Sequence, residues 1–69
     1  MKNPADIAIP IAIIPPKNKA EETHNIHAHG AGAYRKKAIE CRDAHSFHAA
    51  SRFVRLMRNE IRSAKKALA

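Results

Sequence analysis

The chain has 69 residues, a formal charge of +7, one cysteine, three aromatic residues and no tryptophan. A chain of this length forms one small domain that buries only about 60% of its unfolded surface, and one cysteine excludes an intramolecular disulfide framework. We therefore expect a protein of a reducing cytoplasm, with an aliphatic core so thin that a homodimer, or folding on a partner, is favoured.

The charge is distributed unevenly along the chain. Residues 1–30 contain three lysines and three acidic residues, whereas residues 31–69 contain ten lysines and arginines against three acidic residues. The whole net charge therefore belongs to the C-terminal half, which indicates a polyanion or an acidic protein as partner. The alternative is a solvated basic face that only keeps a small protein in solution.

The first expected element is an extended arm over residues 1–17. All four prolines lie within the first sixteen residues, which disfavours a helix. Ile7, Ile9, Ile11 and Ile13 recur with a period of two, so one side of an extended segment is isoleucine, and Pro10 restricts the segment to an edge strand or a polyproline-like arm. We expect the arm to pack on its own helices, on a dimer mate or on another partner, the alternative being a loose tail.

No stretch of the sequence fits a membrane span. The longest apolar stretch, residues 7–14, is far shorter than the roughly 18–20 residues required. It also lacks the cleavage site of a signal peptide. A cytoplasmic location is the expectation that follows.

A helix is predicted over residues 19–43. Asn18, followed three places later by Glu21, resembles a capping box at its start. Small and polar residues then recur in steps of four and three and predict a close helix–helix seam: Ala20, His24, His27, Ala31, Tyr34, Ala38 and Cys41. Two glycines inside this segment each cost about 1 kcal/mol relative to alanine, so a start near Ala33 is the alternative.

A second, strongly amphipathic helix is predicted over residues 47–68. Its apolar stripe consists of Ala50, Phe53, Val54, Met57, Ile61, Ala64 and Leu68. Together with Tyr34, Phe47 and the four alternating isoleucines of the arm, these residues are the predicted core and dimer contact. The opposite side is basic, and its last two lysines suit the C-terminal end of the helix dipole.

The segment "CRDAHSFH" lies where the two patterns meet. The seam of the first helix and the stripe of the second are out of phase, so one straight helix cannot bury both. We predict a break at residues 43–46, with Asp43 or Ser46 capping the second helix; a bent continuous helix is the alternative, because the corner has no glycine or proline. The expected fold is all-α: a helical hairpin over residues 18–69 that pairs with a second copy into a four-helix bundle.

The same segment is also a candidate metal site. Cys41, His45 and His48 share a face of a continuous helix, and thiolate and imidazole are preferred zinc donors. The other histidines, at positions 24, 27 and 29, lie at the far end of an antiparallel hairpin, so we predict no metal and no cofactor. One cysteine near one histidine, in a chain with no room for a substrate pocket, predicts a protein that is not an enzyme and takes no small-molecule substrate.

The basic side of the second helix is the candidate binding site. It consists of Arg52, Arg55, Arg58, Asn59, Arg62, Lys65 and Lys66. Arginine binds phosphates with two parallel hydrogen bonds and asparagine reads adenine edges, so a DNA-binding regulator is the alternative to a protein that binds an acidic partner. A basic amphipathic helix is also typical of segments that lie on anionic lipid.

The overall build, a Pro-rich "NPADIAIPIAIIPP" before "YRKKAIECRDAHSFHAASRFVRLMRNEIRSAKKALA", resembles the small accessory proteins of temperate, lambda-like phages. The likeness concerns overall character, and no residue role is carried over. It implies a regulator of phage development or a modulator of a host protein in the bacterial cytoplasm. We therefore expect a small, non-enzymatic binding protein that forms a dimer and contacts a protein partner or nucleic acid.

Overall fold

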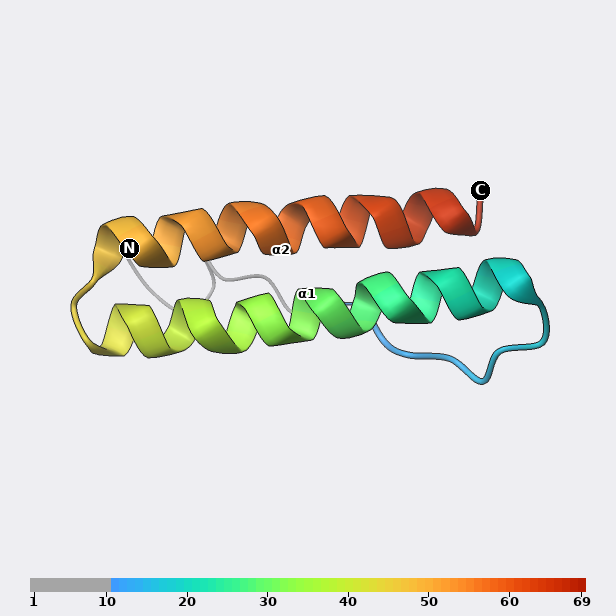
Figure 1. Cartoon of the computed structure of the whole chain (residues 1–69), viewed down its shortest axis with the longest axis horizontal. Coiled ribbons are helices and arrows are strands. Elements are labelled where there is room, and N and C mark those ends of the chain that lie inside the picture. Colours follow the sequence, from blue (N-terminus) through green and yellow to red (C-terminus); the bar gives the residue numbers. More distant parts are fainter. Residues whose placement is uncertain (1–10) are drawn as a thin grey trace.

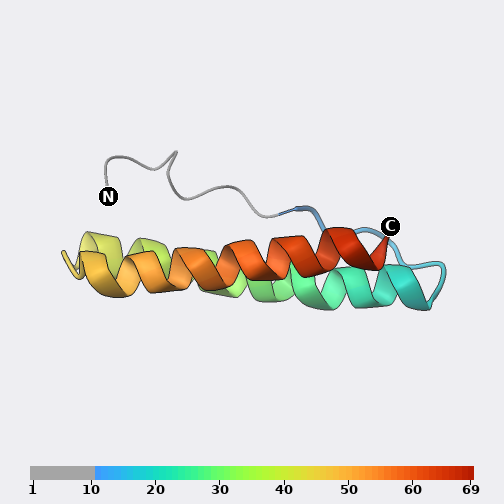
Figure 2. The same cartoon turned by 90° about the horizontal axis from the view of Figure 1, so that it is seen from above.

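A computed structural model describes residues 11–69, which form two antiparallel helices joined by a short corner (Figures 1 and 2). Helix α1 spans Lys19–Asp43 and helix α2 spans Phe47–Ala67. The predicted all-α hairpin is therefore confirmed, and α2 ends one residue earlier than expected. In the described part of the chain, neither helix is long and apolar enough to cross a bilayer.

Asn18 is the N-cap of helix α1, as the capping pattern predicts. Asn18 is extended (φ −153°), and its side-chain oxygen accepts a hydrogen bond of 2.9 Å from the Glu21 backbone N–H. The Glu21 carboxylate accepts from the backbone N–H of Lys17, at 2.7 Å, and so the pair differs from a reciprocal capping box by one residue. The helix continues through Gly30 and Gly32, neither of which has a positive φ. The alternative start near residue 33 is thereby excluded.

The corner between the helices is a Schellman motif. The Ser46 backbone N–H donates to the Cys41 carbonyl at 2.8 Å, and the His45 N–H donates to the Arg42 carbonyl at 2.9 Å. The left-handed position, which glycine usually takes, is occupied by His45 with φ 61°. Histidine enters this region more readily than most residues. The predicted break is confirmed, and the bent continuous helix is excluded.

Ser46 is the N-cap of α2, but its side chain makes no capping hydrogen bond. Its backbone carbonyl accepts the first helical hydrogen bond, from the Ala50 N–H at 2.9 Å. The second helix therefore begins where predicted, but not because a serine hydroxyl caps it. The chain reversal comes from the left-handed residue before it.

The core between the helices consists mostly of alanine. Its fully or nearly fully covered residues are His24, Ala28, Ala31 and Ala38 on α1 and Ala50, Val54, Met57 and Ala64 on α2. Met57 is the largest side chain with no exposed surface. Tyr34 and Phe53 pack against this core with their rings stacked, 6.2 Å between centroids. Small residues on both helices let the backbones approach closely, and the larger residues close the sides.

Three of the described residues predicted to form the core or dimer contact are exposed on the single chain: Ile13, Phe47 and Leu68. Phe47, the first residue of α2, is 44% exposed, and Leu68, its C-cap, is 47% exposed. The Phe47 ring meets the His45 ring edge-on instead, with 5.6 Å between centroids. The hairpin core is therefore shorter than the apolar stripe of α2. Ile61, in contrast, is partly buried against the core as expected.

Residues 11–17 contain neither helix nor strand and fold back along α1 (Figure 1). The Asn25 side chain holds this segment by accepting from the Ile14 N–H at 3.0 Å and donating to the Ile14 carbonyl at 2.6 Å. Ile11 is partly buried, whereas Ile13 is exposed. Ile7 and Ile9, the other isoleucines of the predicted arm, lie outside the described residues.

Candidate functional site

The basic residues of α2 form one exposed surface, which we call the cationic face. It contains Arg52, Arg55, Arg58, Asn59, Arg62, Lys65 and Lys66, and all seven are exposed. The apolar stripe of α2 faces α1, so the opposite side of the helix carries these residues toward solvent. At 1.5 Å per residue, the row from Arg52 to Lys66 is about 21 Å long.

The acidic residues of the hairpin do not neutralise this face. Within residues 11–69, the carboxylates that lie within 4 Å of a basic side chain are Glu60, beside His27, and Asp43, beside Arg42. Glu60, the single acidic residue of α2, turns toward α1, where its carboxylate lies 2.5 Å from the His27 Nδ1. A Cβ on Gly30 would lie 3.4 Å from the same carboxylate group. Glu60 therefore links the two helices, and the six positive charges of the cationic face have no anionic partner among the described residues.

An apolar depression borders the cationic face, and we call it the Leu56 hollow. It is lined by Ala49, Arg52, Phe53 and Leu56 and has a volume of about 180 Å³. Leu56 is 40% exposed, while Phe53 is supported from behind by the stacked Tyr34 ring. Arg52 belongs to both surfaces. The cationic face and the hollow are thus one continuous region of α2.

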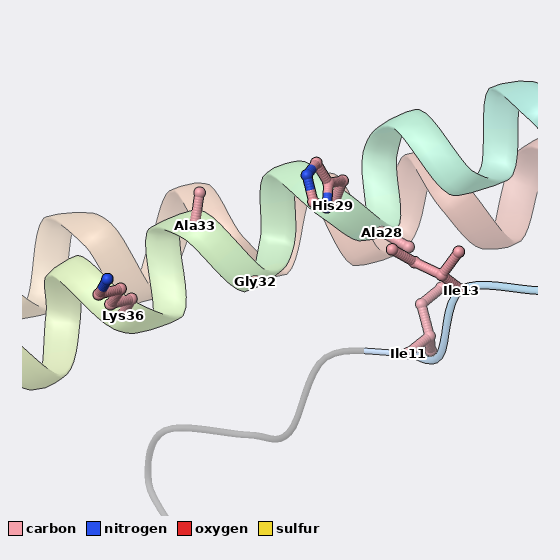
Figure 3. A pocket seen from close by; sticks show the side chains of 7 residues that line it. All are labelled: Ile11, Ile13, Ala28, His29, Gly32, Ala33 and Lys36. Atoms are coloured by element: carbon pink, nitrogen blue, oxygen red, sulfur yellow. The ribbon is translucent and has the colours of Figure 1, made fainter.

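A larger groove lies on the other helix, between residues 11–13 and α1 (Figure 3). It has a volume of about 440 Å³ and is lined by Ile11, Ile13, Ala28, His29, Gly32, Ala33 and Lys36. A Cβ placed on Gly32 would meet no atom within 4 Å, so this groove is open at its centre. Its lining combines two isoleucines with the small residues of α1 and is largely apolar.

The predicted zinc candidates do not share a helix face. Cys41 lies on α1 and is partly buried, His45 is in the corner, and His48 is exposed on α2. Among residues 11–69, no three His, Cys, Asp or Glu side chains are grouped closely enough to bind a metal ion. Of the remaining histidines, His24 is buried and contacts the Asn25 side-chain oxygen at 3.1 Å. The broken helix therefore separates residues that a continuous helix would bring together.

Sequence reasoning missed two features of this site. The first is the interhelical contact between His27 and Glu60, which are 33 positions apart in the chain, so it depends on the register of the two helices. The second is the hollow. Its sequence signal is Leu56, an apolar residue between the arginines of α2, which could have indicated an apolar site beside the basic residues.

No protein-family model, no curated protein and no solved structure matches this chain.

Proposed function

We propose that this chain is a small, non-enzymatic binding protein that holds an acidic surface of a partner protein against the cationic face of α2. One observation carries the proposal: six lysines and arginines lie exposed on one side of one helix, without an ion pair to the described acidic residues. A helix fixes the spacing of these charges. Arginine can also grip a carboxylate with two parallel hydrogen bonds.

The energetics suit a contact that depends on several charges acting together. One exposed ion pair contributes only about 0.2–1 kcal/mol, so no single residue of the cationic face would decide binding. Six such charges attract an acidic surface before contact and accelerate association. Salt screens exposed charges over about 8 Å at physiological ionic strength. We expect affinity to fall steeply as salt is added.

Pairing of two hairpins into a four-helix bundle belongs to the same proposal. Support comes from the short alanine-rich core, together with Phe47 and Leu68, which the single chain leaves exposed. A second copy could cover these ends. A role as a phage regulator or host modulator in the bacterial cytoplasm is the biological setting that the overall character of the sequence supports.

The test compares two double variants with the same net charge. Arg55→Glu with Arg62→Glu reverses two charges at the centre of the cationic face. Lys36→Glu with Lys37→Glu reverses two exposed charges on α1 and is the matched control. Binding of fluorescent poly-L-glutamate, as a model acidic chain, is followed by anisotropy at low and physiological salt, and circular dichroism checks that both variants remain helical.

We expect the α2 variant to lose at least tenfold in affinity, because each reversal replaces an attraction by a repulsion, and we expect the α1 variant to lose much less. Equal losses in the two variants would mean that binding reports only net charge. That result would contradict a dedicated cationic face.

DNA binding is the second candidate function. The observation that favours it is Asn59, which is exposed in the row between Arg55 and Arg62 and has the amide that reads adenine in a major groove. A fluorescent duplex in the same assay tests it. DNA binding predicts that the logarithm of the binding constant falls with the logarithm of salt by about 0.9 for each phosphate contacted. It also predicts that the α2 variant abolishes binding.

A further inference from the structure

We propose that the partner of the cationic face is an acidic helix that inserts one bulky apolar side chain into the Leu56 hollow. This inference rests on the proposed function and specifies the class of partner. It follows from the position of an apolar depression directly beside a row of unpaired cations. The two features share Arg52.

The hollow has the properties of an anchor site. Its volume of about 180 Å³ suits a single leucine-sized side chain. The ring of Phe53, one of its walls, is held by stacking on Tyr34, so this wall is in place before a partner arrives. Protein interfaces concentrate their binding energy in such apolar anchors, surrounded by polar residues. A preformed wall also reduces the ordering cost of binding.

The arginines beside the hollow indicate which residues should flank the anchor side chain on the partner helix. On a partner helix, residues three or four positions from the anchor lie on the same face. Acidic residues at those positions would come close to Arg52, which lines the hollow, and to Arg55, the next residue of the cationic face. An amphipathic helix with one central leucine and flanking glutamates satisfies both features, and helices in grooves are a common recognition mode.

An acidic helix accounts for more of this surface than a nucleic acid does. Phosphates would satisfy the arginines and lysines, but a phosphate backbone carries no apolar side chain to fill the hollow. Leu56, 40% exposed at the centre of α2, would then remain in water. The apolar depression beside the cationic face therefore favours a protein ligand.

The experiment titrates the ¹⁵N-labelled full chain with two synthetic helical peptides. Both are rich in glutamate and alanine, and they differ only at one central position, which is leucine in one and alanine in the other. Burial of the leucine side chain in the hollow removes apolar surface from water. We therefore expect the leucine peptide to bind about tenfold more tightly than the alanine peptide, and we expect its additional chemical-shift changes at residues 49–56.

Variants then assign the preference to the hollow. Ala49→Leu fills the hollow without changing any charge, and we expect both peptides to bind it with the affinity of the alanine peptide. Ala33→Leu makes the same substitution at an exposed position of α1 and is the matched control, which should keep the tenfold preference. Leu56→Ala has the opposite effect on volume, because it removes part of the lining of the hollow. It should also reduce the preference for the leucine peptide over the alanine peptide.

Each remaining outcome overturns the inference in a distinct way. Equal binding of both peptides to the unmodified chain rejects the anchor but leaves the acidic partner intact. Binding of a DNA duplex without binding of either peptide rejects both, in favour of the nucleic-acid function. Concentration-dependent shifts at residues 49–56 without peptide would show that a second copy of the chain occupies the hollow. Absence of all binding rejects the inference and the proposed function together.

Discussion

The two helices contribute different things to the same interface. Helix α1 presents three buried alanines and His24, whereas α2 presents two alanines together with Val54 and Met57. The larger buried apolar side chains, Val54 and Met57, therefore belong to α2, whereas the buried apolar residues of α1 are all alanines. Helix α2 also carries the cationic face, with a single acidic residue that turns back to α1. Helix α2 thus carries both the larger buried apolar side chains and the cationic face, and α1 packs against it mainly with small buried residues.

The largest expected effect comes from removing volume on α2. Met57→Ala deletes the largest fully buried side chain of the described residues. Truncating a buried methionine costs about 2–5 kcal/mol, because apolar contacts are lost and a cavity remains. We expect urea-induced unfolding to show a loss in this range, or an unfolded chain if the hairpin has less stability than that.

Leu56→Ala is the matched control on the same helix, one residue earlier and on the exposed side. Its side chain is already partly in water, so we expect a loss below about 1 kcal/mol. Similar losses for both variants would contradict the idea that α2 supplies the core through one stripe, and would indicate that a second copy buries Leu56.

The sequence predicts this division between the helices well. Steps of three and four locate the seam of α1, and His24, Ala31 and Ala38 from that series are buried. The apolar stripe of α2 is equally informative, because it predicts the buried side of the helix and therefore the exposed side with its seven polar residues. Local patterns succeed here because amphipathic periodicity determines which side of each helix is covered.

Features that depend on the register between the helices could not be predicted in this way. The contact of His27 with Glu60 requires knowing which turns of α1 and α2 face one another. The period of the stripe also does not reveal how far burial extends along α2: Ala50 and Ala64 are its outermost buried residues, and Phe47 and Leu68 are exposed. The left-handed His45 is a similar case, because the usual sequence signal for that position is glycine.

A smaller effect is expected from adding volume on α1. Ala31 has no exposed surface and faces the core around Met57, so Ala31→Leu must push the helices apart. Overpacking of this kind costs about 1–3 kcal/mol. Ala33→Leu, two residues later and exposed, should change the free energy of unfolding by less than about 0.5 kcal/mol. Thermal unfolding of both variants measures the difference, and equal stability would show that α1 is not in close contact with α2.

The smallest effect is expected from stabilising α1 by replacing its glycines with alanine. Both glycines of this helix have helical backbone angles, so alanine at either site should gain about 0.5–1 kcal/mol through helix propensity. At Gly32 a Cβ meets nothing within 4 Å, whereas at Gly30 it would lie 3.4 Å from the Glu60 carboxylate group, which is held by His27.

We therefore expect Gly32→Ala to show the full gain, seen as a rise in melting temperature of about 4–8 °C per kcal/mol for a domain of this size. We expect Gly30→Ala to gain less, because its Cβ would lie at the near limit of van der Waals contact with the Glu60 carboxylate group, and a small shift of that group would weaken its contact with His27. Adding Glu60→Ala to Gly30→Ala tests this cause directly: without the carboxylate, alanine at position 30 should recover the gain seen at position 32. If the two glycine variants are equally stable from the start, Glu60 moves without cost, and the His27–Glu60 contact does not hold the two helices in register.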